Sequence, residues 1–390
     1  MSVGWRLSDE SFMQDVASVS DLKLRLSYGI TGNQDIGNYK SLVTLAPGAN
    51  AVIGGEQVTG VSPDQLANPD LQWEETSQLN LGLDFGLYSN RISGSIDLYS
   101  KKTTDLLLLF DVPQPAVVSK RLANAGEVTN KGIEVALSMI NKSSGNLFWR
   151  TDFNFASNKN EVTDLGDRDQ IIIGRVNGAG LSAVNAQIII PGQPLGTFFG
   201  RRFLGYDTDG TEILSTEGGP LDDGRLILGD AQPDFTFGIS NSINYKNWDF
   251  RLFFQGVLGF DILNNTRLEY QRPSNVFNGI NLFSGALDDV ANGLSPLQSP
   301  TFTDQYIEDG SFVRLQNVTL GYTLGAVLFN GQVKNLRFYL SADNLFVLTG
   351  YDGYDPEVHT FDEADVPTLG IDYTNYPRAR TFSFGFSFGL

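Results

Sequence analysis

The sequence predicts an all-β protein, an antiparallel transmembrane β-barrel segment of about ten to twelve strands. Apolar and polar residues alternate in about ten segments, each roughly the ~9–11 residues that a tilted strand needs to cross a bilayer. Short turns and long polar connections alternate between these segments, as in barrels with short periplasmic turns and long extracellular loops. No apolar run in the 390 residues approaches the ~18–20 that a membrane-spanning helix needs.

The clearest strand is the last, residues 380–390, which read RTFSFGFSFGL. Successive side chains of a strand point to opposite faces, so one face is aromatic and the other consists of Thr, Ser and Gly. In a membrane barrel the first face contacts lipid and the second lines the lumen, whereas in a soluble sandwich the aromatic face would be buried. We expect the barrel-insertion machinery to read this strand as an assembly signal. Its apolar residues are Phe382, Phe384, Phe386, Phe388 and Leu390.

The same alternation predicts nine further strands. An even strand number allows either no further strand or two between residues 157 and 234; we expect two, at 186–190 and 196–206, for a total of twelve. The long connections are 31–75, 101–130, 157–196, 259–310 and 347–378. The nine strands are at about 22–30, 79–87, 91–100, 131–140, 147–156, 235–245, 248–258, 312–324 and 335–346.

Charged residues also lie on the polar faces of these strands. Unpaired charge in a narrow lumen is costly, so we expect the arginines to pair with acidic neighbours on adjacent strands. The arginines are Arg25, Arg251, Arg314 and Arg337, and the acidic neighbours are Asp84, Glu134 and Asp249.

The composition excludes several classes of function. The chain has no Cys, which removes disulfides, zinc fingers and cysteine nucleophiles. The net charge of −18 argues against binding nucleic acid. His359 is the single histidine, and no G-x-S-x-G motif accompanies it, so we predict no enzyme; an outer-membrane phospholipase that uses His359 is the enzymatic alternative. Residues 1–20 lack the layout of a secretory signal peptide.

Nine sequence blocks, in order along the chain, carry a resemblance to a known family. The chain is similar to the C-terminal part of the SusC/RagA family of TonB-linked outer-membrane transporters. Residues 5–12 (WRLSDESF) also resemble a block from inside the family barrel, so we expect Met1 to begin in mid-barrel. The nine blocks are LKLRLSYGITGN (22–33), NPDLQWEET (68–76), NKGIE (130–134), GQPLGTFFG (192–200), FQG (254–256), GSFVRLQN (310–317), DNLF (343–346), YDGYDPE (351–357) and YPRARTF (376–382).

The resemblance implies a barrel of about 22 strands that an N-terminal plug closes. It also implies import of oligosaccharides or peptides, capture of the ligand by a SusD-like surface lipoprotein, and energy supplied by TonB through the N-terminal region. Residues 1–390 would be the C-terminal portion of that barrel, with the plug, TonB box and signal peptide absent from this chain. Two alternatives stay open: a self-contained plugless barrel that acts as a passive porin or adhesin, and a soluble all-β binding module.

Two groups of residues are candidate sites. Tyr351, Asp352, Tyr354 and Asp355 offer the aromatic faces and carboxylates that a sugar-binding surface needs, although Gly353 and Pro356 also fit a plain turn. Asp207 and Asp209 fall where the family often has an acidic D-x-N-x-D-G loop, and they give oxygen ligands for a structural calcium ion or cap an ordinary turn. We expect no other cofactor.

Overall fold

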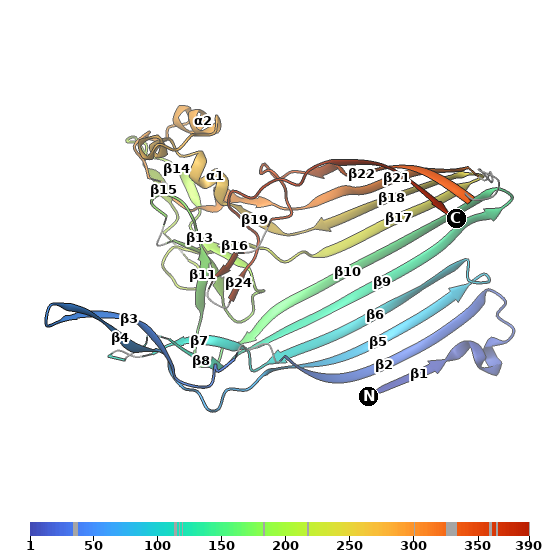
Figure 1. Ribbon diagram of the computed structural model, residues 1–390, viewed down its shortest axis with the longest axis horizontal. Helices are drawn as coiled ribbons and strands as arrows, with labels where there is room; N and C mark the ends of the chain where they lie inside the picture. Colours follow the sequence, from blue (N-terminus) through green and yellow to red (C-terminus); the bar gives the residue numbers. More distant parts are fainter. Residues whose placement is uncertain are drawn as a thin grey trace.

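The chain folds into one large curved sheet with a group of packed loops at one end (Figure 1). This computed structural model describes residues 1–33, 38–112, 115–116, 118, 120–181, 184–216, 218–299, 301–324, 334–358, 361–363 and 366–389.

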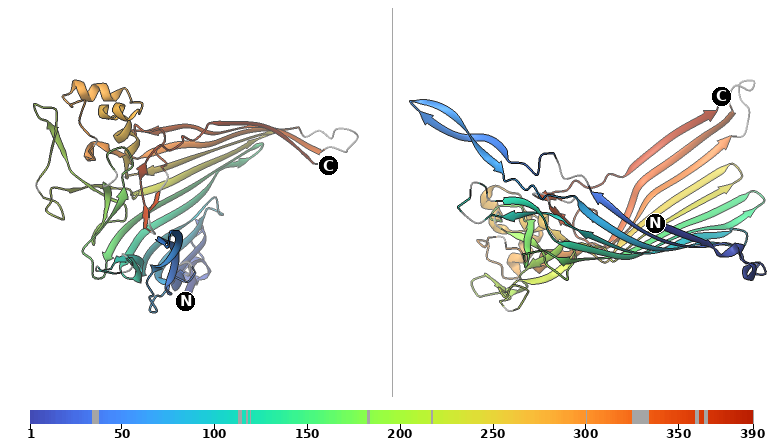
Figure 2. Two further views of the ribbon diagram at one scale, coloured as in Figure 1. Left: turned by 60° about the vertical axis from the view of Figure 1, so that its left-hand side comes forward. Right: turned by 90° about the horizontal axis from the view of Figure 1, so that it is seen from below.

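The large sheet, here called the main sheet, has eleven antiparallel strands in the order β1-β2-β5-β6-β9-β10-β17-β18-β21-β22-β26. Neighbours in the chain are neighbours in the sheet, and β1 and β26 form its two edges (Figure 2). The bounds are β1 Ser2–Arg6, β2 Val19–Asn33, β5 Glu74–Leu87, β6 Ile92–Thr104, β9 Glu127–Ser144, β10 Leu147–Asp164, β17 Phe235–Tyr245, β18 Trp248–Leu258, β21 Phe312–Leu324, β22 Lys334–Thr349 and β26 Thr381–Gly389.

All ten strands with clear alternation are confirmed, and the total lies within the predicted ten to twelve. The prediction of two further barrel strands between 157 and 234 was wrong. Residues 186–190 and 196–206 do form strands, β12 (Asn185–Ile189), β13 (Thr197–Gly200) and β14 (Phe203–Tyr206), but these belong to small sheets outside the main sheet. They have only four or five residues, too few to cross a bilayer. The eleventh strand is instead β1, which pairs with β2.

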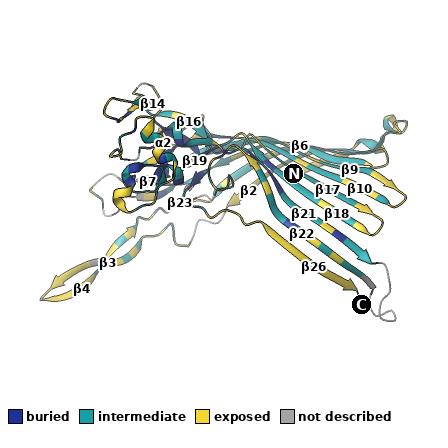
Figure 3. Ribbon diagram, turned by 90° about the horizontal axis from the view of Figure 1, so that it is seen from above, coloured by how far each residue is buried: buried dark blue, intermediate teal, exposed yellow. Residues whose placement is uncertain are grey.

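One face of the main sheet is apolar and open. The register places Leu81 of β5 between Leu26 of β2 and Leu98 of β6, and these side chains are 42%, 50% and 48% exposed. Phe384 at the β26 edge is 74% exposed, and β26 is exposed along most of its length (Figure 3). A continuous exposed apolar surface of this kind is suited to lipid contact.

The opposite face is polar and internally bonded. Arg25 pairs with Asp84 at 2.8 Å and Arg337 with Asp249 at 2.6 Å, as the alternation predicted. Within the described residues no ion pair involves Arg251 or Glu134, whereas Arg314 pairs with carboxylates of a loop. The polar lining is therefore held by charge pairs between strands.

The two ends of the main sheet differ in their connections. Residues 88–91, 145–146 and 246–247 make tight turns at one end, where Tyr88, Ser89 and Asn90 all have positive φ. The link from β1 to β2 contains two single turns, η1 (Leu7–Asp9) and η2 (Ser11–Met13). All the long connections emerge at the other end, and the hairpin of β3 (Thr44–Ile53) and β4 (Glu56–Gln65) projects from it (Figures 1 and 2).

Three of the long connections, residues 165–234, 259–311 and 350–380, pack together into what we call the loop subdomain. One buried cluster joins all three, because Phe198, Leu263, Leu268 and Ile371 are each at most 1% exposed and belong to it. The remaining elements at this end are β7 Leu107–Asp111, β8 Lys120–Asn124, β11 Ile171–Arg175, β15 Glu212–Leu214, β16 Leu226–Asp230, β19 Asp261–Asn264, α1 Asn265–Tyr270, η3 Pro273–Asn278, α2 Gly285–Ala291, η4 Asp304–Tyr306, β20 Ile307–Asp309, β23 Phe361–Glu363, β24 Val366–Thr368 and β25 Ile371–Asp372.

The helices are short. In the described part of the chain, none is long and apolar enough to pass through a membrane.

Candidate functional site

The loop subdomain contains two adjoining cavities that share the side chains of Thr266, Phe283 and Tyr354. The first, here called the polar cavity, has a volume of about 360 Å³. The second, the aromatic cavity, has a volume of about 390 Å³. The polar cavity is also lined by Asn264, Arg267, Gln271, Asp352, Gly353 and Asp372, and the aromatic cavity by Tyr270, Thr374, Asn375, Tyr376 and Pro377.

A parallel pairing between β19 and β25 builds one wall of the polar cavity. It sets Asn264 beside Asp372, although the two are more than a hundred residues apart in the chain. The Asn264 side chain also caps α1 by accepting the Arg267 N–H at 2.8 Å. Thr266 in the first turn of α1 donates to the Asp372 carbonyl at 3.2 Å and accepts the Thr374 N–H at 2.7 Å. The helix start and the last loop are therefore bonded into one surface.

The four predicted substrate residues divide into two pairs. Asp352 and Tyr354 line the polar cavity, and the Tyr354 side chain is 62% exposed. Tyr351 is instead buried, with its hydroxyl donating to Asp372 Oδ2 at 2.5 Å. Asp355 is bonded to Arg314 at 2.5 Å. Tyr351 and Asp355 thus shape the loop, while Asp352 and Tyr354 face the polar cavity.

Arg314 of β21 fixes the base of this loop. Its side chain is fully buried and reaches Asp355 at 2.5 Å and Glu357 at 3.0 Å. It also donates to the Asn344 side chain of β22. Glu357 meets a second cation, Arg378, at 3.2 Å, so both ends of the 350–380 connection are attached to one charge network.

Burial shifts the pKa values of Asp372, which lines the polar cavity, and of Tyr351, which bonds to it. Burial raises the pKa of Asp372, an effect that the hydrogen bond from Tyr351 opposes. Burial, together with the neighbouring Asp372 carboxylate, raises the pKa of Tyr351 well above its usual value. Arg267 donates to Glu308 at 2.9 Å, which offsets its charge. The exposed carboxylate of Asp352 has no ion-pair partner in the described part of the chain, so the polar cavity is anionic.

Sequence patterns did not indicate most of these lining residues. Thr266, Arg267, Phe283 and Tyr376 lie in three different stretches without a shared motif. Phe283 stacks on Tyr270 with ring centroids 5.6 Å apart. The available signal was compositional, since aromatic and polar residues are mixed within long loops of a predicted barrel.

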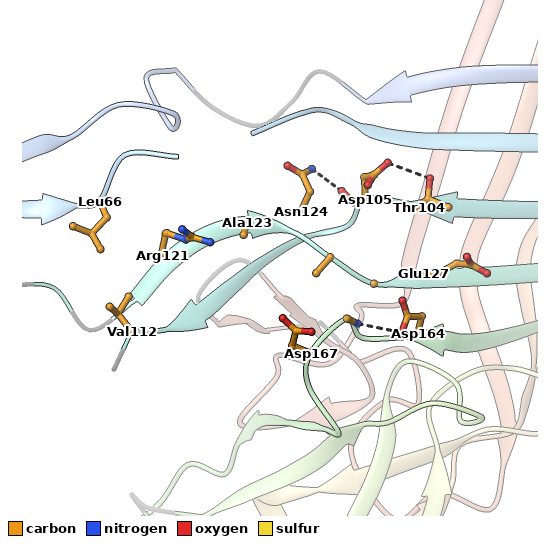
Figure 4. Close-up of a pocket in the computed structure, with 13 residues that line it drawn as sticks. Leu66, Thr104, Asp105, Val112, Arg121, Ala123, Asn124, Glu127, Asp164 and Asp167 are labelled. Atoms are coloured by element: carbon orange, nitrogen blue, oxygen red, sulfur yellow. Dashed lines mark hydrogen bonds between the residues drawn. The ribbon is translucent and has the colours of Figure 1, made fainter. Parts of the chain in front are cut away.

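The largest of the described cavities lies elsewhere, at the ends of β6, β9 and β10, and has a volume of about 710 Å³ (Figure 4). Asn124 holds its wall by donating to the Asp105 carbonyl at 2.8 Å, and Asp105 has a positive φ of 57°. Asp167 and Arg121 line the cavity without ion pairs among the described residues. No sequence motif pointed to this cavity.

The calcium candidates lie in a turn of the loop subdomain. Asp207 Oδ1 accepts the N–H groups of Asp209 at 2.9 Å and Thr211 at 2.8 Å. The described residues contain no group of three or more His, Cys, Asp or Glu side chains placed to hold a metal ion. Calcium binding stays a prediction: a fall in melting temperature on adding EDTA that Asp209→Ala abolishes would establish it.

The terminal strand lies at the edge of the main sheet as β26. The side chains of Phe382, Phe384, Phe386 and Phe388 are 50–74% exposed on one face. Leu390 and the histidine candidate His359 lie outside the described residues.

Comparison with known proteins places these features in a family. Residues 2–345 match the family described as TonB dependent receptor-like, beta-barrel. The chain is 36% identical to TonB-dependent receptor P3 of Formosa agariphila over 98% of this chain and 41% of that protein. It is 30% identical to TonB-dependent receptor SusC of Bacteroides thetaiotaomicron, over 99% of this chain and 39% of that protein.

A solved structure agrees with this match. The structure of the RagAB peptide transporter superposes with a TM-score of 0.81 at 25% identity, covering 99% of this chain and 43% of that one. The chain spans about two fifths of the length of the curated relatives it matches. These relatives are named receptors and transporters, not enzymes. The chain therefore belongs to the TonB-dependent receptor-like β-barrel family, and its main sheet is an outer-membrane sheet of the SusC/RagA type.

Proposed function

We propose that these residues form the C-terminal part of the barrel of a TonB-dependent importer that takes up oligosaccharides or peptides. The observation that carries the proposal is the combination of two features in one chain. The main sheet has an exposed apolar face and an ion-paired polar face, and loops at one end pack around cavities of ligand size.

The edges of the main sheet support a longer barrel. Among the described residues, no strand pairs with the outer side of β1 or of β26, and unpaired backbone groups in lipid cost several kcal/mol each. Further strands of the same protein would pair with these edges and close the barrel. A plug, a TonB box and a signal peptide would lie in the part of the protein outside residues 1–390.

The proposed partners follow from the similarity to SusC and to the RagAB transporter. A SusD-like lipoprotein would cover the loop subdomain and deliver ligand, since the matched transporter structure is a RagAB complex. TonB would act through the N-terminal region. Lipid would contact the apolar face, and the barrel-insertion machinery would recognise β26.

Energised uptake tests the proposal. Cells that carry the full-length protein are given labelled oligosaccharides and peptides, and uptake is measured with and without TonB. We expect accumulation that stops when TonB is deleted. Conductance of the purified protein in a planar bilayer separates the alternative, because a plugless porin conducts steadily without TonB whereas a plugged importer is nearly silent.

A further inference from the structure

We infer that the polar and aromatic cavities are two consecutive subsites for one peptide ligand, which places a basic residue in the first and an aromatic or large apolar residue in the second. This inference rests on the proposed import function and adds the ligand's class and sequence pattern. Continuity is the first argument: the cavities share Thr266, Phe283 and Tyr354, so one ligand that crosses Tyr354 occupies both.

The two cavities differ in chemistry. Asp352 gives the polar cavity a carboxylate that pairs with no cation in the described part of the chain, while the charge of Arg267 is offset by Glu308. An ammonium or guanidinium group bonds well to such a carboxylate. The aromatic cavity is walled by Tyr270, Tyr376 and Pro377, and Tyr376 is 90% exposed. A ligand ring or large apolar side chain would cover this surface.

Two neighbouring subsites that differ in chemistry favour a peptide over an oligosaccharide built from one repeated sugar. A homopolymeric oligosaccharide would place identical units in cavities of opposite character, whereas adjacent residues of a peptide differ freely.

Binding by the full-length transporter tests the inference. The probes are labelled Gly/Ser peptides of one length with a central Lys-Phe step, and matched peptides in which Lys is replaced by Gln or Phe by Ser. A linear glucan oligomer is the glycan probe. Fluorescence anisotropy gives Kd for the parent protein and for Asp352→Asn and Tyr376→Ala.

We expect Asp352→Asn to raise the Kd of the Lys-Phe peptide about tenfold and to leave the Kd of the Gln-Phe peptide unchanged. Tyr376→Ala should raise the Kd of the Lys-Phe peptide several-fold and leave the Kd of the Lys-Ser peptide unchanged. Asp288→Asn on α2 and Tyr39→Ala in the first long loop, exposed residues that line neither cavity, are the matched controls and should change no Kd.

Three results would overturn the inference. The first is a rise in Kd that is equal for all peptides in each variant. The second is a Kd for the Lys-Phe peptide that neither variant changes. The third is binding of the glucan that depends on Asp352 and Tyr376. TonB-dependent uptake of any oligomer alongside these results would leave the proposed function intact. Absence of TonB-dependent uptake would refute the proposed function itself.

Discussion

Arg25 of β2 and Asp97 of β6 form an ion pair across the strand between them, with 3.0 Å separating Nη2 and Oδ1. Gly82 of β5 lies opposite both residues, and a Cβ at this position would lie 2.6 Å from each. Because Gly82 has no side chain, Arg25 and Asp97 can meet over this strand. Arg337 and Asp249 repeat the arrangement over Gly321, where a Cβ would lie within 2.5 Å of both.

Gly82→Ala should therefore destabilise the barrel. The new methyl group would displace the Arg25 guanidinium from Asp97, and overpacking of this kind typically costs about 1–3 kcal/mol. The temperature at which the folded barrel unfolds in detergent, read by circular dichroism, should fall. Gly29→Ala in β2 is the control, because a Cβ there meets no atom within 4 Å. Equal melting temperatures for the two variants would refute the packing argument.

Removing the Arg314 side chain should release the last long loop. Arg314→Met leaves Asp355 and Glu357 without their buried cation, a change that typically costs about 3–5 kcal/mol. We expect faster proteolysis within residues 350–380 and weaker ligand binding, with the barrel still inserted. Arg378→Met removes a half-exposed partner of the same Glu357, and it should cost no more than about 1 kcal/mol. Similar protease resistance of the two variants would contradict this role for Arg314.

The stability of the loop subdomain should rise on mild acidification. Burial raises the pKa of Asp261, and the nearby carboxylates of Asp230, Asp309 and Asp234 raise it further. Burial also raises the pKa of Asp230. A carboxyl with a raised folded-state pKa binds protons more tightly in the folded state, so its destabilising effect is full above that pKa and fades as pH falls toward the ordinary value of 3.8.

Proteolysis rates of the loop subdomain at pH 7 and pH 5 measure this effect. Asp261→Asn should be more resistant than the parent at pH 7, and the difference should shrink at pH 5. Asp288→Asn, which changes an exposed carboxylate, should follow the parent at both values. A constant advantage of Asp261→Asn at both pH values would refute the titration argument.

Replacing two rings of β26 should impair assembly. Phe386→Ser with Phe388→Ser removes apolar surface from the lipid face and from the expected signal for barrel insertion. We expect severalfold less full-length protein in the outer membrane, measured by surface labelling. The control is Ser383→Asn with Ser387→Asn, which keeps the polar face polar. Wild-type amounts of the phenylalanine double variant in the outer membrane would refute a role of these rings in assembly.

The alternation of side chains was enough to predict ten of the eleven strands of the main sheet. Residues 22–30 and 79–87 pair as β2 and β5 with their leucines opposite one another, because lipid on one side and a polar lumen on the other impose a strict period of two. The short segments at 186–190 and 196–206 misled the strand count. Residues 186–189 and 197–200 are buried, so the apolar character of these strands reflects packing in the loop subdomain and not contact with lipid.

The sequence by itself determined the fold class, the ten long strands, the apolar and polar faces and the family resemblance, since each depends on local alternation or on contiguous motifs. The tertiary structure decided which residues of the long loops meet. Asp352 and Tyr354 became cavity residues while Tyr351 and Asp355 became structural, because Asp372 and Arg314 approach them from distant parts of the chain. Such contacts depend on long-range packing between loops, for which a linear sequence has no periodic signal.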